Sequence, residues 1–143
     1  MNTYDHIKLE NQLCFPLYAI SREIIKRYKP VLDPFNLTYT QYITMLVLWE
    51  EEKITFKRLG EKLHLDSGTL TPVLRKLEAM QYIHKYRSKE DDRVVIVEVS
   101  KEGYKLKEEI INVPAQVACH IDLSSEEALV LKEILDKLLT KFD

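Results

Sequence analysis

Apolar positions along the chain predict a largely helical protein. Between residues 7 and 29 they recur every three or four positions, the spacing of one helix face, and Pro16 inside this stretch predicts a kink or local break. YKPVLDPFN then predicts the helix end and a loop. The spaced positions are Ile7, Leu9, Leu13, Leu17, Ile20, Ile24 and Ile25.

The middle of the chain has the pattern of a helix-turn-helix. Thr38 is a suitable N-cap for QYITMLVLWEEE, which is apolar on most sides and is expected to be buried. Thr55 caps a short helix, FKRLGEKL; HLD forms a tight turn, and SGTLTPVLRKLEAMQYI forms a second helix with Pro72 in its first turn. That helix turns Leu70, Val73, Leu74 and Leu77 inward, and Ser67, Thr69, Thr71, Arg75 and Lys76 outward.

The stretch HKYRSKEDDRVVIVEVS follows directly. Val and Ile alternate with other residues in its second part, as in a strand, and its charged RSKEDDR tip is expected to turn, so it predicts a β-hairpin wing. Ser100 caps another helix that runs past residue 113 and bends at Pro114. Ser124 and Glu127 then form a capping box at the start of a final helix with a broad apolar face.

The predicted fold class is mainly α with a small β-wing: a winged helix-turn-helix flanked by N- and C-terminal dimerisation helices. Residues 1–143 form one domain, in which 1–35 and 100–143 are the dimerisation helices and 36–99 the DNA-binding region. The terminal helices carry more apolar surface than this module can cover, which predicts a twofold homodimer. Its two recognition helices would lie about 34 Å apart over a pseudo-palindromic site on double-stranded operator DNA.

Composition narrows the function. Hydrophobic residues make up 45% and charged residues 31% of the chain, as in a globular protein. We find no membrane-spanning run and no export signal, which predicts a cytoplasmic location, where thiols stay reduced. A P-loop, a dinucleotide motif and zinc-ligand spacing are also missing, so we expect no cofactor, no metal and no enzymatic activity.

Charge is concentrated where the DNA contacts are expected. Residues 53–93 hold ten basic and six acidic residues, a net charge of +4, which leaves −6 for the rest of a chain that totals −2. The helix-turn-helix could be only a structural pair of helices, but its basic charge, its outward polar residues and the wing favour DNA binding. Phosphate is the more common target for Arg75 and Lys76 than a guanine edge. We expect Arg87 and Lys89 in the wing to contact DNA too.

Two wing residues and the first cysteine each have an ordinary and a functional reading. Arg93 could be a plain surface ion-pair residue, but beside Asp91 at a wing tip it suggests an arginine oriented for the minor groove. Cys14 could be a small apolar filler. However, Tyr18 lies one helical turn away on the same face, and a phenolic O–H can stabilise a reactive thiolate. Tyr28 is about 21 Å further along the helix and would reach only the partner's Cys14 in an antiparallel pair.

Cys119 also has two readings. It could occupy a core position after Pro114, or it could resolve a Cys14 sulfenic acid as a disulfide. The second reading requires the two Cα atoms to come within about 7 Å.

Four ordered blocks resemble one protein family. LENQLCFPLY, LTYTQYITMLVLWE, LGEKLHLDSGTLTPVLRKLE and RSKEDDRVVIVEVSKEG are similar to the organic-hydroperoxide-sensing, OhrR-like branch of the MarR-type winged-helix regulators, over about residues 5–140. Pro16 is a departure from that branch.

The resemblance implies specific roles for individual residues. Cys14 would be the peroxide-reactive cysteine, Tyr28 and Tyr39 its hydrogen-bonding phenols from the other subunit, and Tyr18 a nearby pocket residue. VPAQVACHI resembles the two-cysteine members, in which a cysteine such as Cys119 forms an intersubunit disulfide.

The sequence thus predicts a dimeric repressor that leaves its operator when an organic hydroperoxide or similar oxidant reacts with it. Two alternatives remain open. One is the same fold responding to a small aromatic ligand. The other, a thiol peroxidase, is less favoured because no βαβ pattern surrounds the cysteine.

Overall fold

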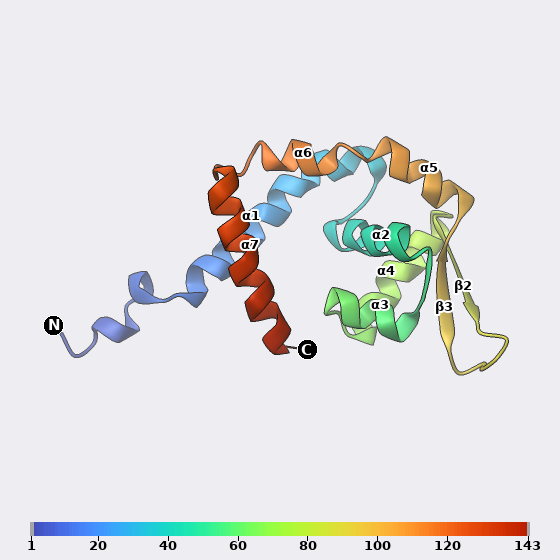
Figure 1. The fold of residues 1–143 in the computed structure, drawn as a ribbon, viewed down its shortest axis with the longest axis horizontal. Coiled ribbons are helices and arrows are strands. Elements are labelled where there is room, and N and C mark those ends of the chain that lie inside the picture. Colours follow the sequence, from blue (N-terminus) through green and yellow to red (C-terminus); the bar gives the residue numbers. More distant parts are fainter. Residues whose placement is uncertain (1, 143) are drawn as a thin grey trace.

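A winged helix-turn-helix body carries two helical arms in the computed structural model, which describes residues 2–142 (Figure 1). This confirms the predicted fold class. The arms are α1 (Cys14–Leu32) and α7 (Ser125–Leu139). The elements between them are α2 (Tyr39–Glu51), β1 (Lys53–Thr55), α3 (Phe56–Leu63), α4 (Ser67–Ala79), β2 (Ile83–Arg87), β3 (Val95–Val99), α5 (Lys101–Glu109) and α6 (Val113–Ala118). Four 3₁₀ turns complete the fold: η1 (Asp5–Ile7), η2 (Leu9–Asn11), η3 (Asp33–Phe35) and η4 (Thr140–Phe142).

The body has a closed apolar core. Its helices begin at the predicted caps: the Gln41 N–H donates to Thr38 Oγ1, and the Thr38 N–H donates back to Gln41 Oε1. Thr55 caps α3 by accepting from the Arg58 N–H, and Ser100 caps α5 by accepting from the Gly103 N–H. Because these caps fix where each helix starts, their apolar faces meet in one cluster, which includes Met45, Leu48, Leu59, Leu70, Leu74, Leu77 and Val97.

The wing is part of a three-stranded antiparallel sheet in the order β1-β3-β2. The predicted hairpin of β2 and β3 is confirmed, and Lys85 pairs with Val97 within it. The sequence analysis missed β1, which pairs with the opposite edge of β3 through Ile54 and Val97. This strand ties the wing to the start of the helix-turn-helix.

The helix-turn-helix is confirmed as α3 and α4, with two corrections in α4. The helix ends at Ala79 rather than near Ile83, because Gln81 turns the backbone into the left-handed region (φ 67°) and Ile83 begins β2. Pro72 is the sixth residue of α4 and not part of its first turn, so the Gly68 carbonyl lacks its usual intrahelical donor.

The predicted helix over residues 7–29 is also corrected. The stretch before α1 forms η1 and η2, and its side chains bond back to its own carbonyls: Asn11 Nδ2 donates to Asp5 O, and Gln12 Nε2 donates to Lys8 O. These local bonds compete with a continuous helix. The chain therefore breaks before Cys14, and Pro16 lies in the first turn of α1, where its missing donor does not interrupt the helix. At the other end α1 continues through Pro30 to Leu32.

The helix predicted from Ser100 past residue 113 is two helices. α5 ends at Glu109, and Pro114 is the second residue of α6 rather than a bend inside a helix. The predicted capping box of α7 is confirmed, since the Glu127 N–H donates to Ser124 Oγ and the Ser124 N–H donates to Glu127 Oε1.

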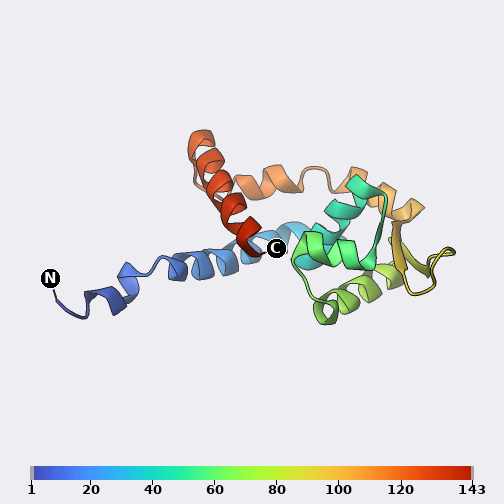
Figure 2. The same ribbon diagram turned by 60° about the horizontal axis from the view of Figure 1, so that its bottom comes forward.

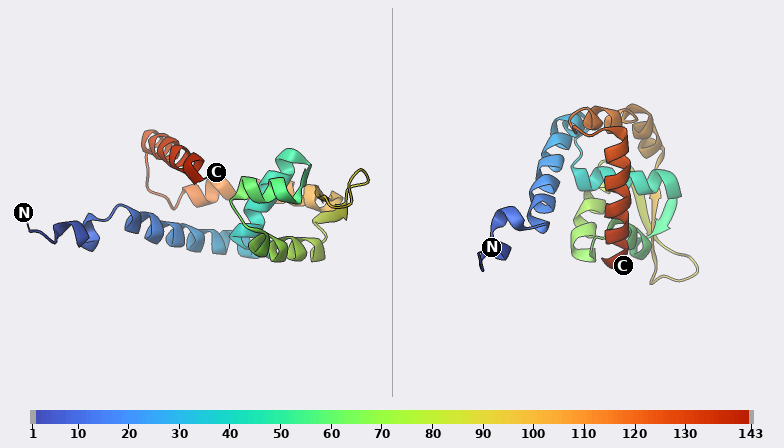
Figure 3. Two further views of the ribbon diagram at one scale, coloured as in Figure 1. Left: turned by 90° about the horizontal axis from the view of Figure 1, so that it is seen from below. Right: turned by 60° about the vertical axis from the view of Figure 1, so that its left-hand side comes forward.

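The arms contrast with the body because their apolar side chains are open to solvent. α6 packs against α1, but the first half of α1 and the whole of α7 project from the rest of the chain (Figures 2 and 3). Every residue of α7 is exposed. The exposed apolar side chains on these two helices include Phe15, Leu17, Ile20, Ile25, Leu129, Val130, Leu131, Ile134, Leu135, Leu138 and Leu139. Within residues 2–142, no helix is both long and apolar enough to cross a membrane.

Candidate functional site

α4 presents a small polar and basic face. Asp66 caps the helix, with the Thr69 N–H donating to Asp66 Oδ1 at 2.8 Å, and this hydrogen bonding lowers the pKa of the Asp66 carboxyl. The sequence analysis did not identify this cap. His64 ends α3 in the left-handed region (φ 54°), which turns the chain sharply into α4. The residues predicted to face outward are Ser67, Thr69, Arg75 and Lys76, which are exposed, and Thr71, which is half-buried.

The close fit between α3 and the turn depends on Gly60. A Cβ atom there would lie 3.0 Å from the carbonyl oxygen of Leu65 and 3.6 Å from a Leu70 methyl group. The missing side chain lets α4 start close beneath α3, with its polar face turned away from the core.

The wing tip holds Arg93 in place while leaving it open to solvent. Its Nε donates to Asp91 Oδ1 at 3.1 Å and its Nη2 donates to Asp91 Oδ2 at 3.2 Å, and these bonds lower the pKa of the Asp91 carboxyl. The Arg93 side chain is still 88% exposed. Arg87, at the other side of the tip, donates from Nη1 to the Asp92 carbonyl at 2.8 Å, and Lys89 is exposed. A planar, pre-positioned guanidinium that remains exposed is well suited to enter a DNA groove.

Cys14 lies at the other end of the molecule, as the first residue of α1, and is exposed. Tyr18 follows one turn later and is 60% exposed. The Arg22 guanidinium lies 5.5 Å from the centre of the Tyr18 ring, and its Nη1 donates to Tyr18 Oη at 3.4 Å. A phenol and a cation therefore lie together within the eight residues of α1 that follow Cys14.

Three tyrosines cluster where α1 meets α2. The ring centres of Tyr28 and Tyr39 are 4.7 Å apart, and those of Tyr28 and Tyr42 are 5.8 Å apart. Burial raises the pKa of all three phenols, with Tyr42 reaching about 12. Each phenol therefore stays protonated, and able to donate, at any physiological pH. Tyr42 was not among the predicted site residues, because in the sequence it looks like one more core position of an apolar helix.

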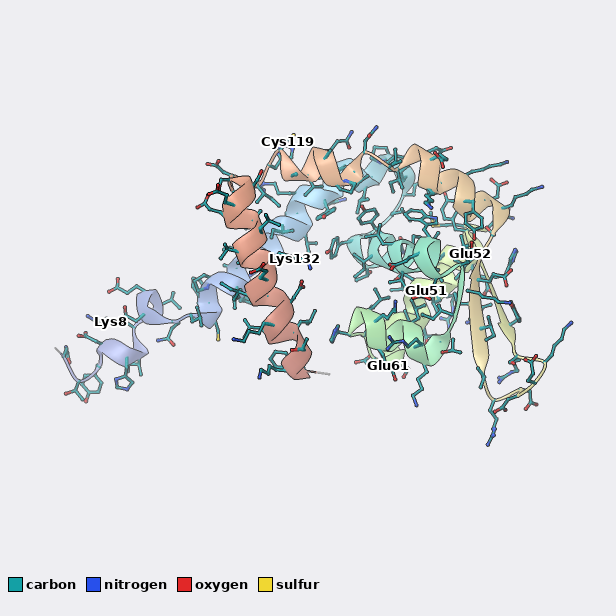
Figure 4. The ribbon with its side chains drawn as sticks, in the orientation of Figure 1. Lys8, Glu51, Glu52, Glu61, Cys119 and Lys132 are labelled. Carbon is teal, nitrogen blue, oxygen red and sulfur yellow. The ribbon has the colours of Figure 1, made fainter. Side chains whose placement is uncertain are left out.

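Cys119 lies at the same end of α1 as this tyrosine cluster. It is exposed at the C-terminus of α6 (Figure 4). It shares a shallow pocket with Pro30, Val31 and Phe35 at the end of α1 and with Gln116 and His120.

Within one chain the predicted thiol site is therefore divided between the two ends of α1. Val31, which lines the Cys119 pocket, follows Cys14 by 17 residues, or about 26 Å of continuous helix. Tyr28 follows Cys14 by about 21 Å. These separations far exceed the length of a hydrogen bond and the span of a disulfide. Within a single chain, Cys14 therefore contacts neither the Tyr28 and Tyr39 phenols nor Cys119.

Comparison with known proteins identifies the family. Residues 26–110 match the family model described as transcriptional regulator SarA/Rot. The chain is 49% identical over 138 residues to the organic hydroperoxide resistance transcriptional regulator of Bacillus subtilis, covering 96% of this chain and 94% of that protein. It belongs to the MarR family of winged-helix transcriptional regulators. Another relative, the HTH-type transcriptional regulator SarZ of Staphylococcus saprophyticus, is 44% identical over 133 residues, covering 93% of this chain and 91% of that protein.

Solved structures of MarR regulators have the same fold. Reduced AbfR bound to DNA superposes with a TM-score of 0.80 at 30% identity, covering 99% of this chain and 100% of that chain. A disulfide-formed AbfR superposes less well, with a TM-score of 0.67 at 31% identity over 94% of this chain and 95% of that chain. An overoxidised AbfR bound to DNA superposes with a TM-score of 0.80 at 32% identity, covering 99% of this chain and 100% of that chain. The present conformation is thus nearer to the two DNA-bound forms than to the disulfide form.

Proposed function

We propose that this regulator is a homodimeric repressor that holds operator DNA when reduced and releases it when a hydroperoxide oxidises Cys14. The observation that carries the proposal is the division of the thiol site between the two ends of α1. If two α1 helices pair antiparallel, each Cys14 lies against the Tyr28, Tyr39 and Cys119 end of its partner. One dimer then holds two complete sites. Operator DNA lies in a compartment that keeps thiols reduced, so the resting state is the dithiol.

The exposed arms support the dimer. Residues 1–35 and 100–143 carry a dense set of uncovered apolar side chains, and a second copy offers the same faces in return. Such isologous pairing is the commonest closed assembly. Residues 36–99, whose core is closed without a partner, then bind the DNA.

We assign the DNA contacts to the outward face of α4 and to the wing. Ser67, Thr69 and Thr71 lie at the start of α4, the part of a recognition helix that meets base edges in the major groove. The basic residues Arg75, Lys76, Arg87 and Lys89 contact phosphates, and Arg93 enters the minor groove, oriented by Asp91.

The chemistry balances in two steps. The Cys14 thiolate attacks the terminal oxygen of an organic hydroperoxide, whose O–O bond breaks, so that sulfur gains the hydroxyl group and the alkoxide takes a proton to leave as an alcohol. The partner's Cys119 thiol then attacks the sulfenic sulfur and forms the disulfide, releasing water. The thiols lose two electrons in total, and the peroxide gains them.

Disulfide formation is the step that we connect to DNA release. Cys119 terminates α6, which follows directly on from α5 and the wing, so drawing Cys119 toward the partner's Cys14 pulls on the DNA-binding body. The behaviour of AbfR supports this order of events. Its overoxidised form is bound to DNA, whereas its disulfide form is the one that superposes less well on this chain.

The test is operator binding, followed by fluorescence anisotropy at fixed salt, for wild type, Cys14→Ser and Cys119→Ser, before and after addition of cumene hydroperoxide. All three should bind when reduced, and only wild type should dissociate on oxidation. Release of Cys14→Ser by peroxide would overturn Cys14 as the sensor. Release of oxidised Cys119→Ser would overturn the disulfide as the trigger. Release by salicylate under reducing conditions would favour a ligand-responsive regulator instead.

A further inference from the structure

Tyr42 is a buried phenol without a hydrogen-bond partner. Only 2% of it is exposed, yet among residues 2–142 its hydroxyl neither donates nor accepts a hydrogen bond. Buried tyrosines usually satisfy this group. No fully enclosed side-chain nitrogen or oxygen in the described chain lacks a partner. The small exposed part of Tyr42 therefore includes its hydroxyl, which opens outward from the core.

Two further phenols belong to the same cluster. The rings of Tyr28 and Tyr39 are in contact, and the Tyr28 ring contacts that of Tyr42. Their hydroxyls also lack partners among residues 2–142. Burial is the main cause of the raised pKa of Tyr42, and the neighbouring phenols of Tyr28 and Tyr39 raise it further. The cluster therefore offers three phenolic O–H donors that are not used within the described chain and that can donate to an acceptor from outside it.

We propose that Tyr42 supplies a third phenolic O–H to the sulfur of the partner's Cys14, alongside Tyr28 and Tyr39. This rests on the function proposed above. A thiolate has three lone pairs and accepts three donors, so the third phenol completes its hydrogen bonding and holds it ionised at neutral pH. Tyr42 lies on the buried face of α2, whereas Tyr28 and Tyr39 are only half-buried. It therefore sets where the sulfur rests, and with it the reactivity of the thiol.

The test isolates the Cys14 thiol in a Cys119→Ser background and measures its alkylation rate by iodoacetamide from pH 4 to 10. Tyr42→Phe keeps the ring and removes the hydroxyl. We expect the midpoint of the rate profile to move up by about one pH unit, with alkylation about ten-fold slower on its lower limb. Tyr28→Phe and Tyr39→Phe should give shifts of similar size. Tyr104→Phe, at an exposed position of α5, is the control and should leave the profile unchanged.

A second variant moves the profile in the opposite direction. Replacing Tyr42 by 3-fluorotyrosine makes the phenol more acidic and a stronger donor, so the midpoint should fall. Reduced operator binding confirms that each variant is folded. If Tyr42→Phe coincides with its parent while Tyr28→Phe and Tyr39→Phe shift, Tyr42 is only a core residue and this inference is overturned. If none of the three shifts the profile, the intersubunit site of the proposed function fails as well.

Discussion

The DNA-binding body and the two arms differ in how far their apolar side chains are covered by the rest of the chain. In the body, the main apolar faces of the helices close on other parts of the same chain, so that Leu48, Leu59 and Leu74 have no exposed surface. In the arms, equally apolar helices stay open, and Leu129 is 67% exposed. The apolar core of the body is covered by its own chain, whereas the apolar faces of the arms are not. In the function proposed above, a second chain covers the arms, completes each thiol site and brings two DNA-binding regions onto one operator.

The largest expected effect comes from breaking an arm. Leu135→Glu places a charge on the apolar face of α7 and should convert the dimer to monomers, because the pairing would bury an unpaired carboxylate. Losing one of two joined half-site contacts should weaken operator binding at least about 100-fold. Sedimentation velocity and anisotropy measure the two effects.

Lys137→Glu is the matched control, with the same new charge on the polar face of the same helix. It should remain dimeric and bind the operator nearly as wild type does. A dimeric Leu135→Glu variant would show that α7 lies outside the interface.

Removing apolar volume from the core of the body should lower the stability of the fold itself. The Leu74 side chain is 0% exposed, so Leu74→Ala leaves a cavity in the core. This variant should lower the free energy of unfolding by about 2–5 kcal/mol, as measured by urea denaturation. Leu135→Ala, on the arm, should instead make the unfolding midpoint more dependent on protein concentration. Equal behaviour of the two variants would remove the distinction between body and arms.

Arg93→Ala tests the wing without touching either core. It should weaken operator binding by about 1–2 kcal/mol, roughly ten-fold, and reduce its dependence on salt, with no change in dimerisation. Lys105→Ala, on exposed α5, is the control. Unchanged affinity in Arg93→Ala would mean that the ion pair with Asp91 serves only the hairpin.

The smallest effect is a pH dependence from Tyr42. Its pKa is about 12 in the folded chain, above the ordinary value of 10.0 for a tyrosine, so the folded state binds the proton more tightly. Stability from this source is fully present below pH 10 and is lost as pH rises toward 12. Tyr42→Phe should therefore flatten the fall in unfolding free energy between pH 10 and 12. An identical slope in the two proteins would contradict the raised pKa.

The body was largely predictable from sequence because its signals are local. Thr38 and Thr55 each cap a helix of the body through a bond three residues away, and the charged residues between β2 and β3 mark the turn of the hairpin. What was missed depends on distant or unusual contacts. β1 is three residues long and is defined only by pairing with β3. α4 ends because Gln81 adopts a left-handed backbone conformation. Such a position is usually signalled by a glycine in the sequence, and here there is none.

The thiol site was predictable only in part, for a different reason. Residue types and spacing pointed to Cys14 and Tyr18 on one helix, but the sequence does not say which chain supplies the other half. The pattern also extended the first helix back to Ile7, because the bonds from Asn11 and Gln12 to nearby carbonyls have no periodic signature. Tyr42 was hidden by its apolar neighbours.

The central claim is that one site joins Cys14 of one chain to Cys119 of the other. Mixed dimers test it most directly: refold a Cys14→Ser chain with a Cys119→Ser chain, add one equivalent of cumene hydroperoxide per Cys14, and run a non-reducing gel with peptide mass mapping. The mixture should give a covalent dimer linked Cys14 to Cys119, while each variant alone stays uncrosslinked. A Cys14–Cys119 bond within one wild-type chain, or no crosslink in the mixture, would contradict the account.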